Sequence, residues 1–198
     1  MKKIIALLLM LTCAFAMFAC GDDEPTEEEL AYQAIIAEYT KAAYTAPTAL
    51  TVKVSTASVF GTLTSEYKTT YATDGSASIA YSVDKINGLD SADEKTTLTG
   101  TINVDASGNY ADGGSFAGTN PLASGVKLNL ASDKVAFRAT SELLSGTVAS
   151  ADTEAVLGIA IATDVTLTVT KADGKITSVA LAYTVDGNAV NALCTYAY

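Results

Sequence analysis

Two kinds of hydrophobic periodicity follow one another along the chain, and the first is helical. Thr26 followed by Glu29 has the spacing of a capping box, in which each side chain binds the backbone N–H of the other residue. Pro47 cannot continue a helix. Between these positions apolar residues recur at helical spacing, namely Tyr32, Ile35, Ile36, Tyr39 and Ala43. The pattern predicts one amphipathic helix over 26–44. Its acidic first turn and single Lys41 favour packing on a sheet over a membrane surface.

From Leu50 onward apolar and polar residues alternate, which is the period of a half-buried strand. Frequent Thr supports strands, because β-branched residues favour them. The expected strands are 50–54, 63–71, 79–83, 98–104, 109–116, 126–130, 135–139, 164–170, 179–185 and 189–198. Gly100 lies within one of them and predicts a bend or bulge. Hairpin signals stand at Asp74-Gly75, Asn87-Gly88, Asp173-Gly174 and Asp186-Gly187.

The stretch 141–163 fits neither period. It is apolar with few charges, so it is either a short helix or an irregular apolar loop. Thr153 followed by Glu154 would allow an N-cap and a helical turn or two near 154–161. A crossover of this kind would cover one face of a curved sheet.

These elements predict an α+β, mostly β fold. We expect a single domain over 26–198 with one curved, half-barrel-like antiparallel sheet of about eight or more strands. The helix 26–44 is expected against the concave face of the sheet, because its apolar stripe must be buried.

The first twenty residues have the pattern of a secretory targeting signal. Lys2 and Lys3 precede an apolar run over 4–18, which ends at Ala19 and Cys20. Met17-Phe18-Ala19-Cys20 resembles the lipobox of bacterial lipoproteins with type II signal peptides. The resemblance implies removal of residues 1–19, diacylglycerol on the Cys20 sulfur, and a membrane anchor at the periplasmic or cell-surface side of a bacterial envelope. The alternative is an ordinary cleaved signal with an incidental Cys.

Residues 20–25 then form an acidic, Pro-containing tether that cannot bury apolar surface. This stretch resembles the acidic export signal that follows the Cys in surface lipoproteins of Bacteroidota. A plain acidic linker is the alternative.

Composition excludes several classes of function. The formal net charge is −10, and so acidic a chain is not expected to bind nucleic acid. The chain has no His, which excludes His-dependent triads and His-rich metal sites. Only Cys194 remains once Cys13 is cleaved off and Cys20 is lipidated, and we expect it to be a small buried hydrophobe. We therefore expect no enzyme, no catalytic residue, no cofactor and no metal.

Two further features are candidate sites. The only arginine, Arg138, is either a surface residue on a strand or a clamp for an anionic head group. The sequence 105–109 is Asp-Ala-Ser-Gly-Asn, which we interpret as a hairpin turn because a full calcium-loop pattern is missing.

The order of elements over 26–198 resembles the half-barrel lipoproteins, which include the LolA/LolB carriers and the mycobacterial LppX/LprG group. In that family a curved sheet and its covering helices enclose an apolar cavity for acyl chains. The resemblance implies a lipid pocket lined by inward side chains: Ile35, Ile36, Tyr39, Tyr67, Tyr71, Tyr81, Ile102, Leu167, Leu181 and Tyr183. The alternative is that these residues form a packed core. The two functions that follow are a lipid-anchored binder or carrier of a hydrophobic ligand, and a structural or adhesive surface lipoprotein without such a ligand.

Overall fold

The computed structural model describes residues 25–87, 95–110, 122, 125–131 and 134–198. The expected signal peptide, Cys20, most of the tether, the turn at Gly88 and nearly all of the expected strand 109–116 lie outside the described residues. A boundary between Gln33 and Ala34 divides the described residues into two units.

The helix expected over 26–44 is α2 (Glu27–Ala43). Its capping box is formed as the sequence predicts. The backbone N–H of Glu29 donates to Thr26 Oγ1 at 3.2 Å, and the N–H of Thr26 donates to Glu29 Oε2 at 2.8 Å. Three acidic residues occupy the first turn and Lys41 the last, which suits the helix dipole.

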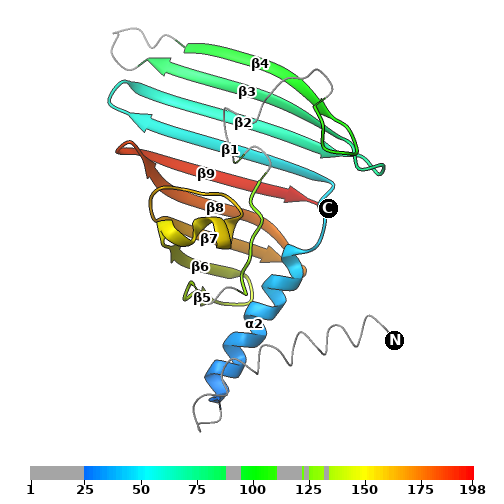
Figure 1. The fold of residues 1–198 in the computed structure, drawn as a ribbon, viewed down its shortest axis with the longest axis vertical. Coiled ribbons are helices and arrows are strands. Elements are labelled where there is room, and N and C mark those ends of the chain that lie inside the picture. The colour runs from blue at the N-terminus through cyan, green and yellow to red at the C-terminus, as the bar shows by residue number, and fades with distance from the viewer. Residues whose placement is uncertain (1–24, 88–94, 111–121, 123–124, 132–133) are drawn as a thin grey trace. The chain divides into compact units, whose positions relative to one another are not determined.

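One open antiparallel sheet makes up most of the domain, as expected. The strands are β1 (Ala49–Ser58), β2 (Gly61–Tyr71), β3 (Ala77–Asn87), β4 (Lys95–Val104), β5 (Arg138–Ala139), β6 (Leu143–Val148), β7 (Val165–Ala172), β8 (Lys175–Val185) and β9 (Asn188–Ala197). Their order in the sheet is β4-β3-β2-β1-β9-β8-β7-β6-β5 (Figure 1). The first and last strands are therefore neighbours, and two meanders meet where β1 pairs with β9.

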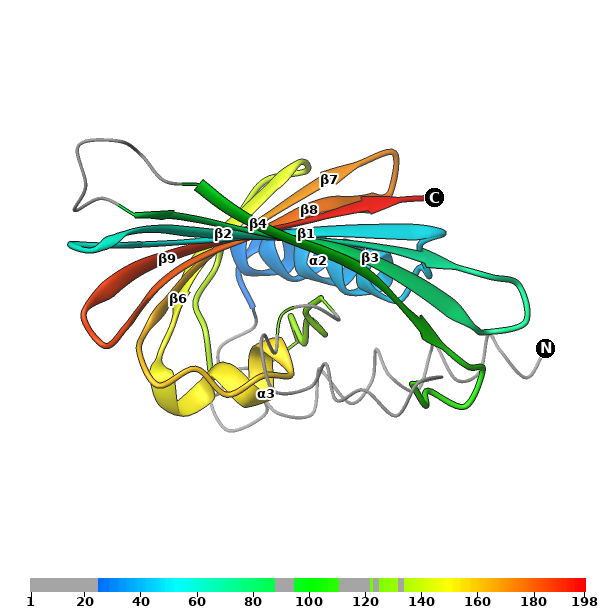
Figure 2. The ribbon, with the colours of Figure 1, turned by 90° about the horizontal axis from the view of Figure 1, so that it is seen from above.

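The register gives the sheet two faces of different chemistry. Val52 of β1 pairs with Tyr67 of β2 and with Cys194 of β9, and all three side chains are buried on what we call the inner face. On the outer face Lys53 lies opposite Glu66, and their side chains form an ion pair at 2.9 Å. α3 (Thr153–Leu157) and the part of α2 from Ala34 onward lie on the inner side (Figure 2).

The hairpin turns of the C-terminal meander are those that the sequence predicts. Asp173 and Gly174 have φ of 51° and 72°, and Asp186 and Gly187 have φ of 50° and 78°. Consecutive positive φ values are what a two-residue type I′ turn requires. β7, β8 and β9 therefore form the meander expected over 164–198.

Three local expectations need correction. Of the bend or bulge expected at Gly100, the bulge is wrong, because β4 pairs with β3 in unbroken register. Instead the Tyr81 side chain lies over Gly100, because a Cβ at Gly100 would be 2.3 Å from the Tyr81 hydroxyl. Residues 126–130 form no strand, because the N–H of Lys127 donates to Leu157 O rather than to a sheet ladder. The strand expected over 135–139 is reduced to β5, Arg138–Ala139.

The stretch 141–163 contains a strand that the sequence analysis did not expect, β6, followed by the short η3 (Ser150–Asp152) and α3. The short helix expected near 154–161 is α3. The expected N-cap role of Thr153 is wrong, because Thr153 is the first residue of α3 and its hydroxyl points elsewhere. That hydroxyl accepts from the N–H of Ile161 at 2.9 Å and donates to Ser150 O at 3.1 Å.

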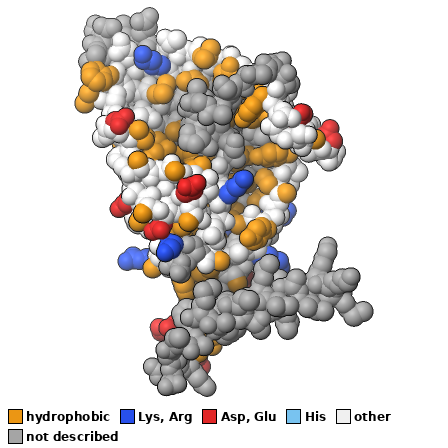
Figure 3. Space-filling view, in the orientation of Figure 1, with side chains coloured by type: hydrophobic (Ala, Val, Ile, Leu, Met, Phe, Trp, Pro, Cys, Tyr) orange, Lys and Arg blue, Asp and Glu red, His pale blue; other side chains and the backbone are white. Residues whose placement is uncertain are grey.

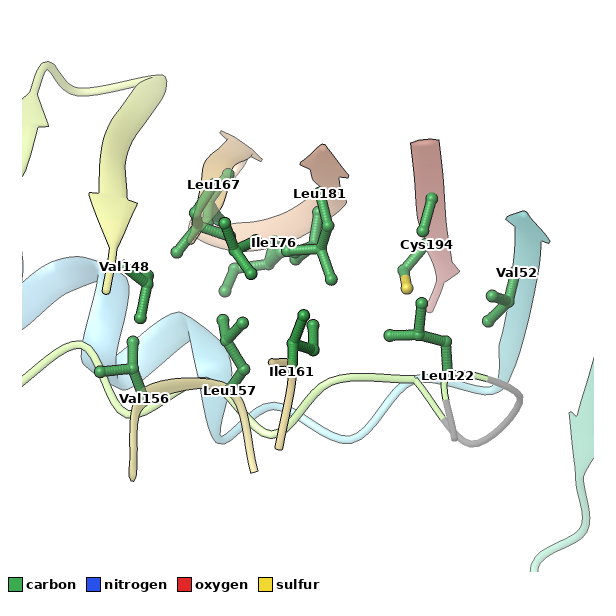
Figure 4. Packing of buried hydrophobic residues seen from close by; sticks show 14 of the residues in the cluster. Val52, Leu122, Val148, Val156, Leu157, Ile161, Leu167, Ile176, Leu181 and Cys194 are labelled. Atoms are coloured by element: carbon green, nitrogen blue, oxygen red, sulfur yellow. The ribbon is translucent and has the colours of Figure 1, made fainter. Parts of the chain in front are cut away.

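The apolar crossover covers the inner face as expected. Leu157 and Ile161 point toward Leu167, Ile176 and Leu181 of the sheet, and Val156 points toward Val148 (Figure 4). Further along the face Leu122 points toward Cys194 and Val52 (Figure 4). The larger side chains of this cluster are almost completely buried, so this part of the inner face is a filled core.

Candidate functional site

The ten residues implied as pocket lining fall into three groups. Four belong to the buried core: Tyr39, Tyr67, Leu167 and Leu181. Five are partly buried and pack against that core: Ile35, Ile36, Tyr81, Ile102 and Tyr183. Tyr71 lines a pocket at the end of the sheet. The structure thus brings nine of the ten into or against one core and places Tyr71 at the pocket.

This pocket has a volume of about 330 Å³ and lies between the C-terminal end of α2 and the inner face of β1, β2 and β9. We call it the tyrosine pocket, because Tyr44, Tyr71, Tyr196 and Tyr198 all line it. The other lining residues are short or apolar with one exception, the lysine: Ala42, Ala43, Thr45, Pro47, Leu50, Gly125, Val126, Lys127, Leu128 and Ile176. Most of the wall is therefore aromatic and aliphatic, as in many small-molecule sites.

One wall is the turn that follows α2. The N–H of Thr45 donates to Ala42 O at 3.1 Å, which closes the helix end. The N–H of Thr48 donates to Ala197 O at 2.7 Å, and the N–H of Tyr71 donates to Thr48 O at 3.0 Å. Because these bonds tie the turn to both β9 and β2, the wall is fixed to the sheet.

The opposite wall is the extended segment 125–128. Gly125 has a φ of +76°, and a Cβ there would lie 2.8 Å from Leu50 Cδ2. Only glycine accommodates that backbone conformation and that close approach. The N–H of Lys127 donates to Leu157 O at 3.0 Å, so α3 holds the segment in place.

The tyrosines supply flat apolar surfaces and several hydroxyls. Tyr198 OH donates to Ile176 O at 2.9 Å, and Lys175 Nζ lies 4.9 Å from the centre of the Tyr198 ring. Burial raises the pKa of Tyr71 and of Tyr196 above the ordinary tyrosine value. Both phenols therefore stay neutral at physiological pH. The Tyr196 hydroxyl is already bonded to Cys194 and to the Val126 backbone, whereas the half-exposed Tyr71 can donate a hydrogen bond to a ligand.

A second hollow lies between α2, the β5–β6 connection and the end of β7, and it is lined by several charged residues. It has a volume of about 540 Å³ and is lined by Glu38, Lys41, Ser141, Glu142 and residues 171–174. Its buried member, Lys171, pairs with Glu38 at 2.6 Å and lies 4.8 Å from the centre of the Tyr39 ring. These contacts join α2 to β7, and the Lys171 ammonium lowers the pKa of Glu38. We assign this hollow a structural role.

The other candidate residues from the sequence, Cys194, Arg138 and Asp105, are either structural or exposed. Cys194 is buried, and burial raises the pKa of its thiol to about 11, so it stays protonated at neutral pH. Arg138 is exposed on β5. The Asp105 carboxylate accepts the N–H groups of Ser107 and Asn109, both at 2.9 Å, and thereby closes the expected hairpin turn. The hydrogen bonds from Asn109 hold the pKa of Asp105 below its ordinary value.

On the face that carries α3, charged side chains are scattered singly or in pairs (Figure 3). Within the described ranges, no group of three or more His, Cys, Asp or Glu side chains is arranged to hold a metal. The helices of that part are too short or too polar to cross a membrane.

Sequence reasoning missed three of the four pocket tyrosines. Tyr196 and Tyr198 are two residues apart within the predicted strand 189–198, a spacing that places both on one face of that strand. In the structure β9 ends at Ala197, and Tyr198 directly follows it. Tyr44 is the last residue of the predicted helix 26–44, and only the folded chain shows that it lies at the exposed edge of the same pocket. No protein-family model, curated protein or solved structure matches this chain.

Proposed function

We propose that this chain is a lipid-anchored protein of the bacterial cell envelope that binds a small hydrophobic ligand, without catalysis, in the tyrosine pocket. The observation that supports it is the pocket itself, a ligand-sized hollow with four tyrosines around aliphatic residues. Its volume is at the lower end of the range for small-molecule sites, about 300–1,000 Å³. It therefore suits one ring or one short chain and not several acyl chains.

The ligand half of the proposal is tested by filling the pocket. Ala43 lines it, and Ala43→Leu would occupy part of its volume. Ala34→Leu is the matched control, since Ala34 is exposed on the same helix and lines neither hollow. We expect 1-octanol to bind saturably to the wild type and to Ala34→Leu, and to bind much more weakly to Ala43→Leu. No saturable binding, or equal binding to all three, would contradict the proposal.

Residues 21–198 are suitable for these titrations. Among the described residues, every buried member of the core lies between Tyr39 and Cys194, so residues 21–198 contain all of that core. Circular dichroism of each variant checks that the sheet is intact.

The anchor is proposed from the sequence of residues 17–20 and is tested separately. The mature wild-type chain should begin at Cys20, carry the mass of diacylglycerol and sediment with membranes. Cys20→Ser should lack that added mass. A mature wild-type chain without lipid would overturn the anchor and leave the pocket proposal standing.

A structural or adhesive surface lipoprotein is the alternative function, and the outer face of β6–β9 favours it. The outward residues there are small or uncharged: Ser145, Thr147, Thr166, Thr168, Thr170, Ser178, Ala180, Ala182, Asn191, Leu193 and Thr195. Such a face offers hydroxyls to a protein or glycan without charge repulsion. This function requires exposure on the cell, so failure of a membrane-impermeant label to reach the protein on intact cells would exclude it.

A further inference from the structure

The turn between β1 and β2 differs in chemistry from two other hairpin turns of the sheet. Those turns are Asp173-Gly174 and Asp186-Gly187, whose residue types suit a two-residue turn. Between β1 and β2 the same two places are occupied by Val59 and Phe60. Their residues are 83% and 67% exposed, so neither belongs to the core. This apolar pair, which we call the hairpin tip, therefore has no explanation in packing.

The residues on either side of the tip form the turn. The N–H of Phe60 donates to Ser58 Oγ at 3.2 Å, and the Ser58 hydroxyl donates to Gly61 O at 3.3 Å. Gly61 has a φ of 131°, which favours glycine. Because these neighbours fix the backbone, a polar pair at 59–60 would suit the turn at least as well. The bonds also give the Phe60 N–H a partner, which lowers the cost of moving it out of water.

Other exposed apolar side chains lie near the hairpin tip. Leu63 follows Gly61 by two residues, and Ile86 pairs with Thr62 in the neighbouring strand. Val185 is the last residue of β8, at the turn beside the tip. Leu63, Ile86 and Val185 are all exposed. Figure 3 shows apolar side chains at the left edge, where Figure 1 places the β1–β2 turn. The tip therefore projects from an end of the sheet that carries further apolar surface.

The small size of the hairpin tip favours a bilayer over a protein as its partner. Its two side chains offer on the order of 200 Å², whereas a stable protein interface buries about 800 Å² of each partner. A bilayer surface needs no matching shape, because each apolar side chain enters its fluid boundary separately. Among the described residues at this end, Lys85 and Asp186 have opposite charges and Lys95 pairs with Asp84. Charge therefore adds no net attraction, and the apolar side chains must supply the binding.

We propose that the hairpin tip, Val59 and Phe60, inserts into the boundary between head groups and acyl chains of a zwitterionic lipid bilayer. This surface is separate from the tyrosine pocket, which lies at the opposite end of β1, and it goes beyond the ligand binding proposed above. The contact is made by side chains and does not require a lipid on Cys20. Since the chain has a net charge of −10, anionic lipids should weaken the contact.

A single Trp at the tip tests the contact, because the chain has no Trp of its own. Residues 21–198 with Phe60→Trp, checked by circular dichroism, are titrated with dioleoylphosphatidylcholine vesicles. We expect the Trp emission to shift to the blue as lipid is added and to be quenched by brominated acyl chains. Adding Val59→Ser should raise the lipid concentration needed for the same shift about tenfold. Vesicles that contain phosphatidylglycerol should give a smaller shift.

Leu193→Trp is the matched control, because Leu193 is exposed on the outer face in the middle of β9, away from the tip. It should show neither the shift nor the quenching. No lipid-dependent shift in Phe60→Trp, or equal shifts in both variants, would overturn the proposal. A blue shift of Phe60→Trp that grows with protein concentration in the absence of lipid would also overturn it, and would assign the tip to a contact between copies of this chain.

Discussion

Replacing Leu157 by Ala tests whether α3 packs on the inner face of the sheet and completes the hydrophobic core. Leu157 is completely buried and points toward the sheet beside Val156 and Ile161 (Figure 4). The change removes three carbon atoms, which contribute about 0.8 kcal/mol each by burial, or about 2.4 kcal/mol in all. The cavity left behind adds to this, so we expect a loss of about 3 kcal/mol in the free energy of unfolding.

Urea unfolding followed by circular dichroism measures this loss. With an m-value of ~2 kcal/mol/M, the midpoint should fall by about 1.5 M. Leu193→Ala is the control, because Leu193 is 41% exposed on the outer face of β9. It should cost less than about 1 kcal/mol. If Leu157→Ala costs no more than Leu193→Ala, the reasoning that α3 packs on the sheet is refuted.

Three other changes probe separate contacts, each by urea unfolding. Thr153→Val should cost about 1–3 kcal/mol, because it leaves the buried N–H of Ile161 without its acceptor; Thr153→Ser, which keeps the hydroxyl, should cost clearly less, and equal losses would contradict this role. Gly100→Ala should destabilise β4 because its Cβ would lie 2.3 Å from the Tyr81 hydroxyl, whereas neutrality would mean that the Tyr81 ring does not cross Gly100. The pKa of Glu38 is lowered mainly by Lys171, so their ion pair stabilises the fold at neutral pH and is lost as the pH falls below 4.5 through the folded-state pKa. Glu38→Gln should therefore have a lower free energy of unfolding than the wild type at pH 7, and the difference should be smaller at pH 3. The same difference at both pH values would contradict a stabilising ion pair between Glu38 and Lys171.

The sequence predicted the elements whose signals are local. The capping box fixed the start of α2, and alternation with Asp-Gly turns fixed β7–β9, because these patterns depend on neighbours along the chain. The interpretation of Gly100 as a bulge is wrong because the glycine leaves room for the Tyr81 ring of the neighbouring strand. No pattern of neighbouring residues along the chain reveals that contact. The strand predicted over 126–130 is absent for a similar reason, because α3 provides the hydrogen-bond partners for this backbone that a neighbouring strand would otherwise provide.

The candidate site was harder to predict than the sheet. An inward-facing residue lines either a cavity or a core, and periodicity does not distinguish the two. Leu167 and Leu181 became core because the crossover around α3 covers them, whereas Tyr71 lies beyond that cover at the end of the sheet. The pocket forms only where the end of α2, β9 and segment 125–128 meet, so it depends on contacts between distant parts of the sequence.

The most direct test of the central claim maps where a hydrophobic ligand binds. Residues 21–198, labelled with ¹³C in the tyrosine rings, are titrated with 1-octanol, and each ring signal is assigned by a Tyr→Phe variant. The account predicts saturable shifts for Tyr71 and Tyr196, which line the pocket, and none for Tyr67 and Tyr183, which belong to or pack against the core. Shifts confined to Tyr67 and Tyr183, or no shifts at all, would contradict it.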